Sequence, residues 1–89
     1  VSAAAAPAPD PLDRTLAALA DPARRRVVDL LRERPRRAGE LADALSVSPS
    51  VMSRHLKVLR DNDVVDEQSP DFDARVRIYS LRPGATAEL

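Results

Sequence analysis

The sequence predicts a single small domain that is mainly α-helical and ends in a small β-hairpin. The 89 residues suffice for one hydrophobic core, and 44% of them are hydrophobic, but Phe72 and Tyr79 are the only aromatic residues. The apolar surface must therefore come from Leu, Val and Ala, which favours a helical domain over an all-β sandwich or barrel. Apolar residues recur at helical spacing through most of the chain and alternate with a period of two near its end.

The first nine residues, VSAAAAPAP, have neither a charged start nor a long apolar run. They match neither a signal peptide nor a membrane anchor, so we expect a disordered leader over 1–9 and a folded domain over 10–82. Residues 83–89 would be a tail, where a C-terminal helix, short or truncated, begins. No later apolar run approaches the length that crosses a bilayer, so we expect a cytoplasmic protein with no membrane partner.

Two helix starts follow the leader. Asp10-Pro11 predicts the first, because Asp accepts hydrogen bonds from the free amides of a first turn and Pro there has no amide to leave unpaired. Three leucines then lie on one face of this helix: Leu12, Leu16 and Leu19. Asp21-Pro22 repeats the signal, and the second helix ends before Pro35. Its apolar stripe consists of Ala23, Val27, Leu30 and Leu31.

A short third helix is predicted over 38–45, followed by a turn at Ser46-Val47. Ser48-Pro49 again combines a cap with a proline and begins a fourth helix that ends near 60–62. The inward residues are Leu41, Ala42 and Leu45 in the third helix and Met52, Leu56 and Leu59 in the fourth. Both helices are thus predicted to turn an apolar stripe to one core.

Beyond the fourth helix the apolar period changes to two. Residues 64–68 and 76–81 alternate as strands, and the turn-rich segment 69–73 connects them as a hairpin. The order is helix, helix, helix, tight turn, helix, hairpin. This is the plan of a winged helix-turn-helix domain.

In that plan the second helix of the helix-turn-helix enters the DNA major groove. If the apolar stripe of the fourth helix faces the core, four polar residues face away from it: Ser50, Ser53, Arg54 and Lys57. Hydroxyl and cationic groups of this kind contact bases and phosphates. The alternative interpretation is a merely solvated helix face.

Charge is distributed unevenly although the net charge is zero. Residues 21–60 hold ten Lys and Arg against five Asp and Glu, whereas 61–73 hold six acids and no base. The basic block favours DNA, and the acidic run should keep the wing from lying flat on the phosphate backbone. Residues 24–26, all Arg, either contact phosphate or pair with Asp21 or Asp29.

No catalytic or metal-binding set is present in the sequence. There is no Cys, and His55 is the single histidine, so a thiolate or His-rich metal site is excluded. Ser53 lies two residues from His55 on a helix and points elsewhere, and two glycines cannot form a phosphate loop. We therefore expect no enzyme, no cofactor and no metal. His55 itself is either a packing residue or a pH-sensitive group.

Three segments, 19–26, 39–42 and 53–59, resemble the ArsR-type (arsenic-repressor-like) winged-helix regulators of bacteria, and the resemblance covers roughly 12–82. It implies that DNA contacts fall on Pro49, Ser50, Ser53 and Arg54, and in the wing on Arg75 and Arg77. Metal-sensing members carry a Cys pair where this chain has Arg37 and Gly39. The resemblance therefore implies no thiolate sensing.

The family also pairs through its first helix and a C-terminal helix. Only the first is clearly present here, and it implies a dimer interface on Leu12, Leu16 and Leu19. Some of these leucines must also serve the core, so we expect a homodimer that is weak until both protomers are held on one duplex.

Together these observations predict a sequence-specific DNA-binding transcriptional regulator. We expect a repressor that binds a two-fold operator in double-stranded DNA as a homodimer, associated with the nucleoid. The alternative is a winged-helix module for protein–protein interaction without an operator, which the acidic wing and the zero net charge favour.

Overall fold

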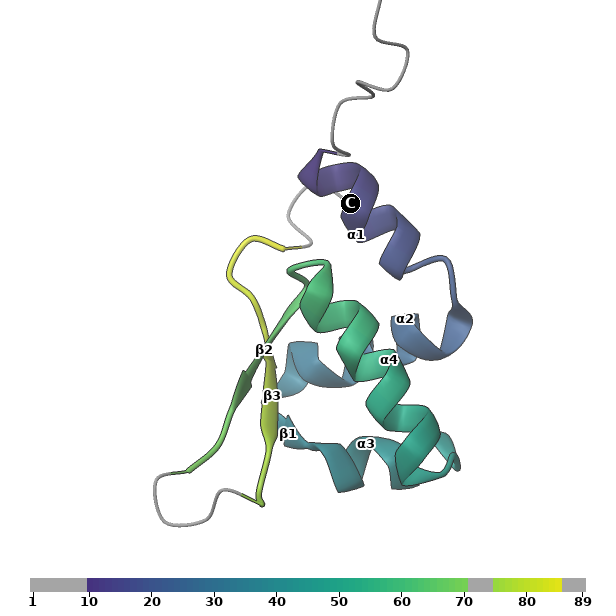
Figure 1. Ribbon diagram of the computed structural model, residues 1–89, viewed down its shortest axis with the longest axis vertical. Helices are drawn as coiled ribbons and strands as arrows, with labels where there is room; N and C mark the ends of the chain where they lie inside the picture. Colours follow the sequence, from purple (N-terminus) through teal and green to yellow (C-terminus); the bar gives the residue numbers. More distant parts are fainter. Residues whose placement is uncertain (1–9, 71–74, 86–89) are drawn as a thin grey trace, which may run out of the picture.

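The computed structural model describes residues 10–70 and 75–85. These residues form four helices and one three-stranded antiparallel sheet, with the helices packed to one side of the sheet (Figure 1). The elements are α1 (Pro11–Ala18), α2 (Pro22–Glu33), β1 (Arg36–Arg37), α3 (Ala38–Leu45), α4 (Pro49–Asp61), β2 (Val65–Gln68) and β3 (Ile78–Leu81). None of the helices in this part of the chain has the length and apolar character needed to span a membrane. The winged helix-turn-helix prediction is confirmed.

Three helices begin at the predicted caps. The side-chain oxygens of Asp10, Asp21 and Ser48 each accept a hydrogen bond from a first-turn amide, at 2.7 to 3.2 Å, and each of these residues precedes a proline. Because the cap satisfies an amide that has no partner within the helix, it fixes where the helix starts. The predicted bounds of α3 and the buried stripe of α4 are also confirmed.

The core lies between α2, α3, α4 and the sheet, with one residue from α1. Its buried hydrophobic residues are Ala18, Val27, Val28, Leu31, Leu41, Ala42, Met52, Leu56, Leu59, Val64, Val65 and Tyr79. Aliphatic side chains dominate this set, as the composition predicts.

The leucines of α1 do not mark its buried face. The buried residues of this helix are Thr15 and Ala18, whereas Leu16 is 50% exposed and Leu19 is partly buried against the core. Thr15 is tolerated there because its hydroxyl donates to the carbonyl of Pro11 at 2.9 Å, so no polar group is left unsatisfied. The buried face of α1 is therefore made by small residues, and the dimer interface expected on Leu12, Leu16 and Leu19 stays a prediction.

The sheet has a strand that the sequence does not predict. Arg36 and Arg37 of β1 pair with Tyr79 and Ile78, so β3 lies between β1 and β2. Two residues are too few to show an alternating pattern, which is why only the hairpin was predicted. The hairpin strands are also shorter than predicted, at 65–68 and 78–81. The predicted leader, 1–9, part of the wing connection, 71–73, and the tail end, 86–89, lie outside the described residues.

The tight turn between α3 and α4 depends on one left-handed residue. Ser46 has φ 55°, and the amides of Ser46 and Val47 donate to the carbonyls of Asp43 and Ala42. These hydrogen bonds close the end of α3 and redirect the chain at once into the Ser48 cap. The two helices of the helix-turn-helix are thereby held in contact.

Removal of the Ser48 cap should destabilise the domain. We expect Ser48→Ala to lower the free energy of unfolding by about 0.5–2 kcal/mol, because it leaves a first-turn amide of α4 without its acceptor. Urea unfolding of the DNA-free protein measures this change. Ser50→Ala is the matched control, since Ser50 is exposed in the same turn and caps nothing, and equal losses for both variants would contradict the assignment.

Candidate nucleic-acid interface

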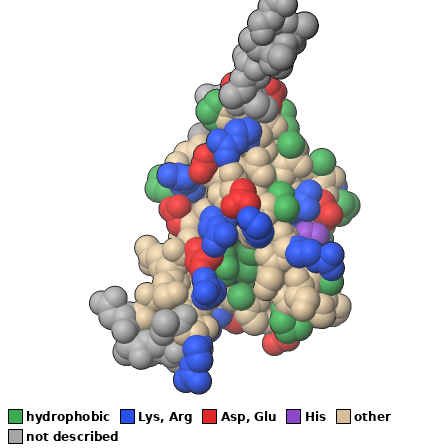
Figure 2. Space-filling view, in the orientation of Figure 1, with side chains coloured by type: hydrophobic (Ala, Val, Ile, Leu, Met, Phe, Trp, Pro, Cys, Tyr) green, Lys and Arg blue, Asp and Glu red, His purple; other side chains and the backbone are tan. Residues whose placement is uncertain are grey.

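The surface of α4 that faces away from the core is polar. Met52, Leu56 and Leu59 are each no more than 1% exposed and fix the orientation of the helix. All five predicted contact residues on α4 are consequently exposed: Pro49, Ser50, Ser53, Arg54 and Lys57. Figure 2 shows Lys and Arg side chains gathered over this side of the molecule. These residues lie together on one accessible face, and their role as DNA contacts stays a prediction.

The two cations on this face differ in their partners. Lys57 Nζ lies 2.8 Å from Asp61 Oδ2, and its hydrogen bond lowers the pKa of Asp61 below its ordinary value. The guanidinium of Arg54 forms no ion pair or hydrogen bond with any residue in 10–70 or 75–85. Part of the Lys57 charge is thus offset within the protein, whereas the Arg54 donors point to solvent.

The wing is attached to α4 through the carboxylate of Glu67 on β2. Arg60 of α4 donates to Glu67 Oε2 at 2.6 Å, Tyr79 donates to the same oxygen at 3.1 Å, and Arg77 donates to Oε1. The Glu67 side chain is only 12% exposed. One carboxylate therefore joins the end of α4 to both hairpin strands, and these contacts were not predicted from the sequence.

The three donors also control the ionisation of Glu67. Burial raises its pKa, but the hydrogen bonds from Arg77, Arg60 and Tyr79 outweigh burial, so the net pKa is lowered. Burial and the charge of Glu67 raise the pKa of Tyr79 in turn. At neutral pH the site therefore holds an ionised carboxylate and a neutral phenol that donates to it.

Most of the acidic run is paired with arginines. Asp63 forms ion pairs with Arg14 at 3.0 Å and with Arg82 at 2.6 Å, and Asp66 lies 3.9 Å from Arg82. The two acids at 71 and 73 lie outside the described residues. Since the described carboxylates face internal cations, they oppose DNA phosphate less strongly than the sequence suggests.

The wing arginines lie on the surface next to this cluster. Arg75 and Arg77 are both exposed, and Arg77 combines an exposed position with its ion pair to Glu67. Both are candidates for contacts outside the domain, and their assignment as DNA contacts stays a prediction.

The arginines that open α2 bind the end of α1. Arg24 Nε donates to the carbonyl of Ala18, and Arg25 Nη1 donates to that of Leu19 at 2.7 Å. Carbonyls at a helix C-terminus carry partial negative charge, which explains why cations are favoured here despite the N-terminus of α2. Arg24 also lies 3.7 Å from Asp21, as one of the two alternatives proposed. The sequence signal for these contacts is the position of the arginines directly after the end of the first helix.

His55 lies between α4 and the junction of α1 with α2. Its Nδ1 is 3.5 Å from Arg24 Nη1, and the residue is half-buried. In the described ranges no group of three or more His, Asp or Glu side chains is arranged to hold a metal ion. The position favours a packing and contact role for His55.

Comparisons with known proteins agree with this geometry. A helix-turn-helix domain family matches residues 19–68. The HTH-type transcriptional regulator Rv2034 of Mycobacterium tuberculosis is 40% identical over 77 residues, which cover 86% of this chain and 69% of that protein. The transcriptional repressor SdpR of Bacillus subtilis is 30% identical over 56 residues, 63% of this chain and 62% of that protein. The crystal structure of the ArsR family transcriptional regulator RHA00566 superposes with a TM-score of 0.77 at 26% identity, covering 88% and 82% of the two chains.

The fold and these matches place the chain in the winged helix-turn-helix class of DNA-binding transcriptional regulators. Within that class, the chain belongs to the ArsR-type family of transcriptional regulators.

Ionised Glu67 should stabilise the domain in a pH-dependent way. Because its pKa is lower in the folded state, its contribution is present above the ordinary carboxyl pKa and is lost as the pH falls through the folded-state value. We expect Glu67→Gln to cost about 1–3 kcal/mol of unfolding free energy at pH 7. Chemical unfolding of both proteins from pH 7 to pH 3 measures the difference, which should shrink with acid.

The control for this experiment is Glu33→Gln. Glu33 is exposed and its contact with Arg36 is long, at 3.7 Å, so its removal should change stability little at any pH. A loss for Glu67→Gln that is the same at pH 3 and pH 7 would show that the charge does not stabilise the wing.

Proposed function

We propose that this protein is a repressor that binds a two-fold operator as a homodimer and reads its sequence through α4. The observation that carries the proposal is the exposed face of α4, on which Arg54, which has no partner among the described residues, lies beside two serines. In a helix-turn-helix complex these early residues of the second helix reach the base edges.

Arg54 is the residue best suited to recognise a base. Its planar guanidinium matches the O6 and N7 acceptors of guanine, which a lysine ammonium cannot contact in two places. Ser50 and Ser53 add short donors and acceptors on the same face, and Pro49 is exposed at its start. Arg75 and Arg77 supply positive charge from the wing for phosphate contact.

The alternative function, a protein-interaction module without an operator, depends on the acidic run near the wing. The described acids of this run, Asp61, Asp63, Asp66 and Glu67, are each in contact with Lys or Arg of the same chain. This pairing leaves less acidic surface for a protein partner, which supports the DNA-binding proposal over the alternative. The relative named as a transcriptional repressor supports repression as the outcome.

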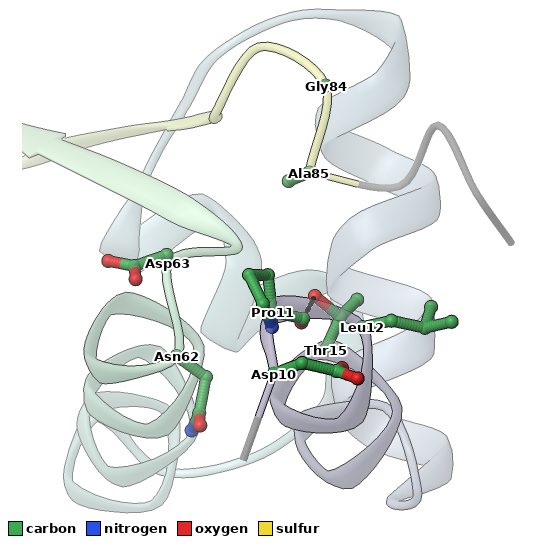
Figure 3. Close-up of a pocket in the computed structure, with 8 residues that line it drawn as sticks. All are labelled: Asp10, Pro11, Leu12, Thr15, Asn62, Asp63, Gly84 and Ala85. Atoms are coloured by element: carbon green, nitrogen blue, oxygen red, sulfur yellow. Dashed lines mark hydrogen bonds between the residues drawn. The ribbon is translucent and has the colours of Figure 1, made fainter. Parts of the chain in front are cut away.

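A two-fold operator requires two α4 helices about 34 Å apart, and one domain supplies one. The exposed half of Leu16 and the partly exposed Leu12 leave apolar surface on α1 for a second protomer. Leu12 also lines a hollow of about 370 Å³ between the start of α1, the end of α4 and the segment after β3 (Figure 3). Leu19 packs on the domain's own core, so it contributes less to pairing than the sequence suggests.

Changes to Arg54 and Lys57 should affect DNA binding differently. We expect Arg54→Ala to cost about 1–3 kcal/mol of binding free energy and to relax the preference at one base position. Lys57→Ala is the matched control, because Lys57 shares its charge with Asp61 and should weaken all sequences alike. Binding to a library of single-base operator variants measures both. Uniform losses for both changes would make Arg54 a phosphate contact only.

Pairing through α1 should be sensitive to charge at Leu16. We expect sedimentation at low micromolar concentration to show mainly monomer, or monomer in exchange with dimer, and two chains per full operator duplex. Leu16→Glu should abolish the two-chain complex, because it buries a carboxylate between protomers. A half-site duplex is the control, since one protomer should bind it equally well with either residue. A two-chain complex that survives the change would place the interface elsewhere.

A further inference from the structure

A second basic feature lies between the helix-turn-helix and the wing. A cleft of about 300 Å³ separates the start of α3 from the residues that lead into β3, and it is lined by Arg37, Arg75 and Arg77 together with Gly39 and Glu40. All three arginines are exposed. Almost forty residues of sequence separate Arg37 from Arg75, so only the fold brings the arginines together.

The single carboxylate among these lining residues is already occupied. Glu40 accepts from Arg34 at 2.8 Å and from the amide of Arg37 at 3.2 Å, and Arg36 lies 3.9 Å away. The hydrogen bond from Arg34 lowers the pKa of Glu40, so it stays ionised and bound. Arg37 itself forms no ion pair with any residue that the structure describes. Arg77 is ion-paired with Glu67, whereas the charge of Arg37 faces no acid among the described residues and is available to a ligand of the cleft.

The floor of the cleft leaves room for a ligand. A Cβ atom added at Gly39 would meet nothing within 4 Å, so the backbone of the first turn of α3 is open to the outside at this point. Arginine side chains around an open backbone turn supply the N–H donors that a tetrahedral oxyanion accepts from.

From this arrangement we propose that the cleft binds one phosphate of the DNA backbone, held by Arg37 with Arg75 and Arg77. The inference rests on the proposed DNA-binding function and adds to it the contact that ties the wing to the helix-turn-helix on the duplex. The start of α3, the wing side of the sheet and the start of α4 lie toward the same lower end of the molecule (Figure 1). A duplex that meets α4 therefore passes this cleft. An extended polyanion fits an open site with exposed arginines better than a small free anion, which arginines usually enclose.

Two variants test the cleft, both in the 89-residue chain. Arg37→Gln removes the uncompensated charge. Gly39→Asp places a carboxylate in the cleft where space is free, and an acid in the first turn favours the helix, so this variant should fold. The control, Arg32→Gln, removes the same charge from an exposed residue on α2 that pairs with Asp29.

The DNA probe is a duplex recovered by selection of random sequences on the unmodified protein. We expect Arg37→Gln and Gly39→Asp each to weaken binding about tenfold or more, and Arg32→Gln to change it less than about threefold. The log–log salt slope should become shallower for Arg37→Gln by about 0.9 for the lost phosphate contact of each protomer. Thermal unfolding of each variant verifies that the fold is retained.

Single neutral methylphosphonates placed along the duplex identify the phosphate. The unmodified protein should lose affinity at one particular phosphate in each half-site, and Arg37→Gln should show no further loss at that phosphate while keeping the losses elsewhere. Additive losses at every phosphate would overturn the inference. So would Arg37→Gln and Gly39→Asp variants that bind the duplex as tightly as the unmodified protein.

Two further outcomes separate this inference from the proposed function. If the unmodified protein selects a duplex, but Arg37→Gln and Gly39→Asp bind it as well as Arg32→Gln does, the cleft inference fails and the proposed function stands. If selection recovers no preferred duplex, the proposed function fails and the inference with it. Saturable shifts of the Gly39 amide signal on titration with inorganic phosphate, combined with unchanged DNA binding by Arg37→Gln, would assign the cleft to a free oxyanion and overturn the DNA-phosphate inference.

Discussion

The hydrogen-bonded carboxylate of Glu67 is the contact on which the position of the wing depends. It is largely buried and accepts hydrogen bonds from Arg60 in α4, from Tyr79 in β3 and from Arg77 directly before β3. A buried carboxylate is stable only when such donors are present, so the hairpin cannot tilt from α4 without exposing or unpairing a charge. The helix α4 and the wing are consequently held in one arrangement, with Arg60 and Arg77 bonded to the same carboxylate.

The sequence predicts the helices well because their ends are determined locally. Each of α1, α2 and α4 begins with a side-chain acceptor followed by a proline, and these signals act over three or four residues. The strand β1 and the Glu67 cluster could not be predicted in this way. The strand β1 pairs with a strand near the other end of the chain, and Glu67 bonds to residues 7 to 12 positions away that lie in or next to other elements. Neither Arg36 nor Glu67 differs locally from an ordinary surface residue.

In α1 the spacing of the leucines does not show which face of the helix is buried. Leucines at helical spacing usually mark a buried face, yet here a threonine and an alanine are buried and Leu16 is exposed. A short helix contacts the core along a narrow line, and small residues on that line allow close approach, so volume decides the orientation as much as hydrophobicity does. For the candidate site, the exposed face of α4 and the i,i+4 pair of Lys57 with Asp61 could be predicted from a helix pattern, whereas the partner of Arg77 required the fold.

Arg24 has a consequence for how two protomers would be arranged. One guanidinium contacts the last carbonyl of α1, the acid that caps α2 and the ring of His55 in the middle of α4. The helix α1, which is proposed for pairing, and α4, which is proposed to read DNA, are thus connected through Arg24 within a single protomer. In a dimer held through α1, the separation and tilt of the two reading helices would be set by this internal joint. Such a dimer would bind only operators with one spacing between half-sites, whatever bases those half-sites contain.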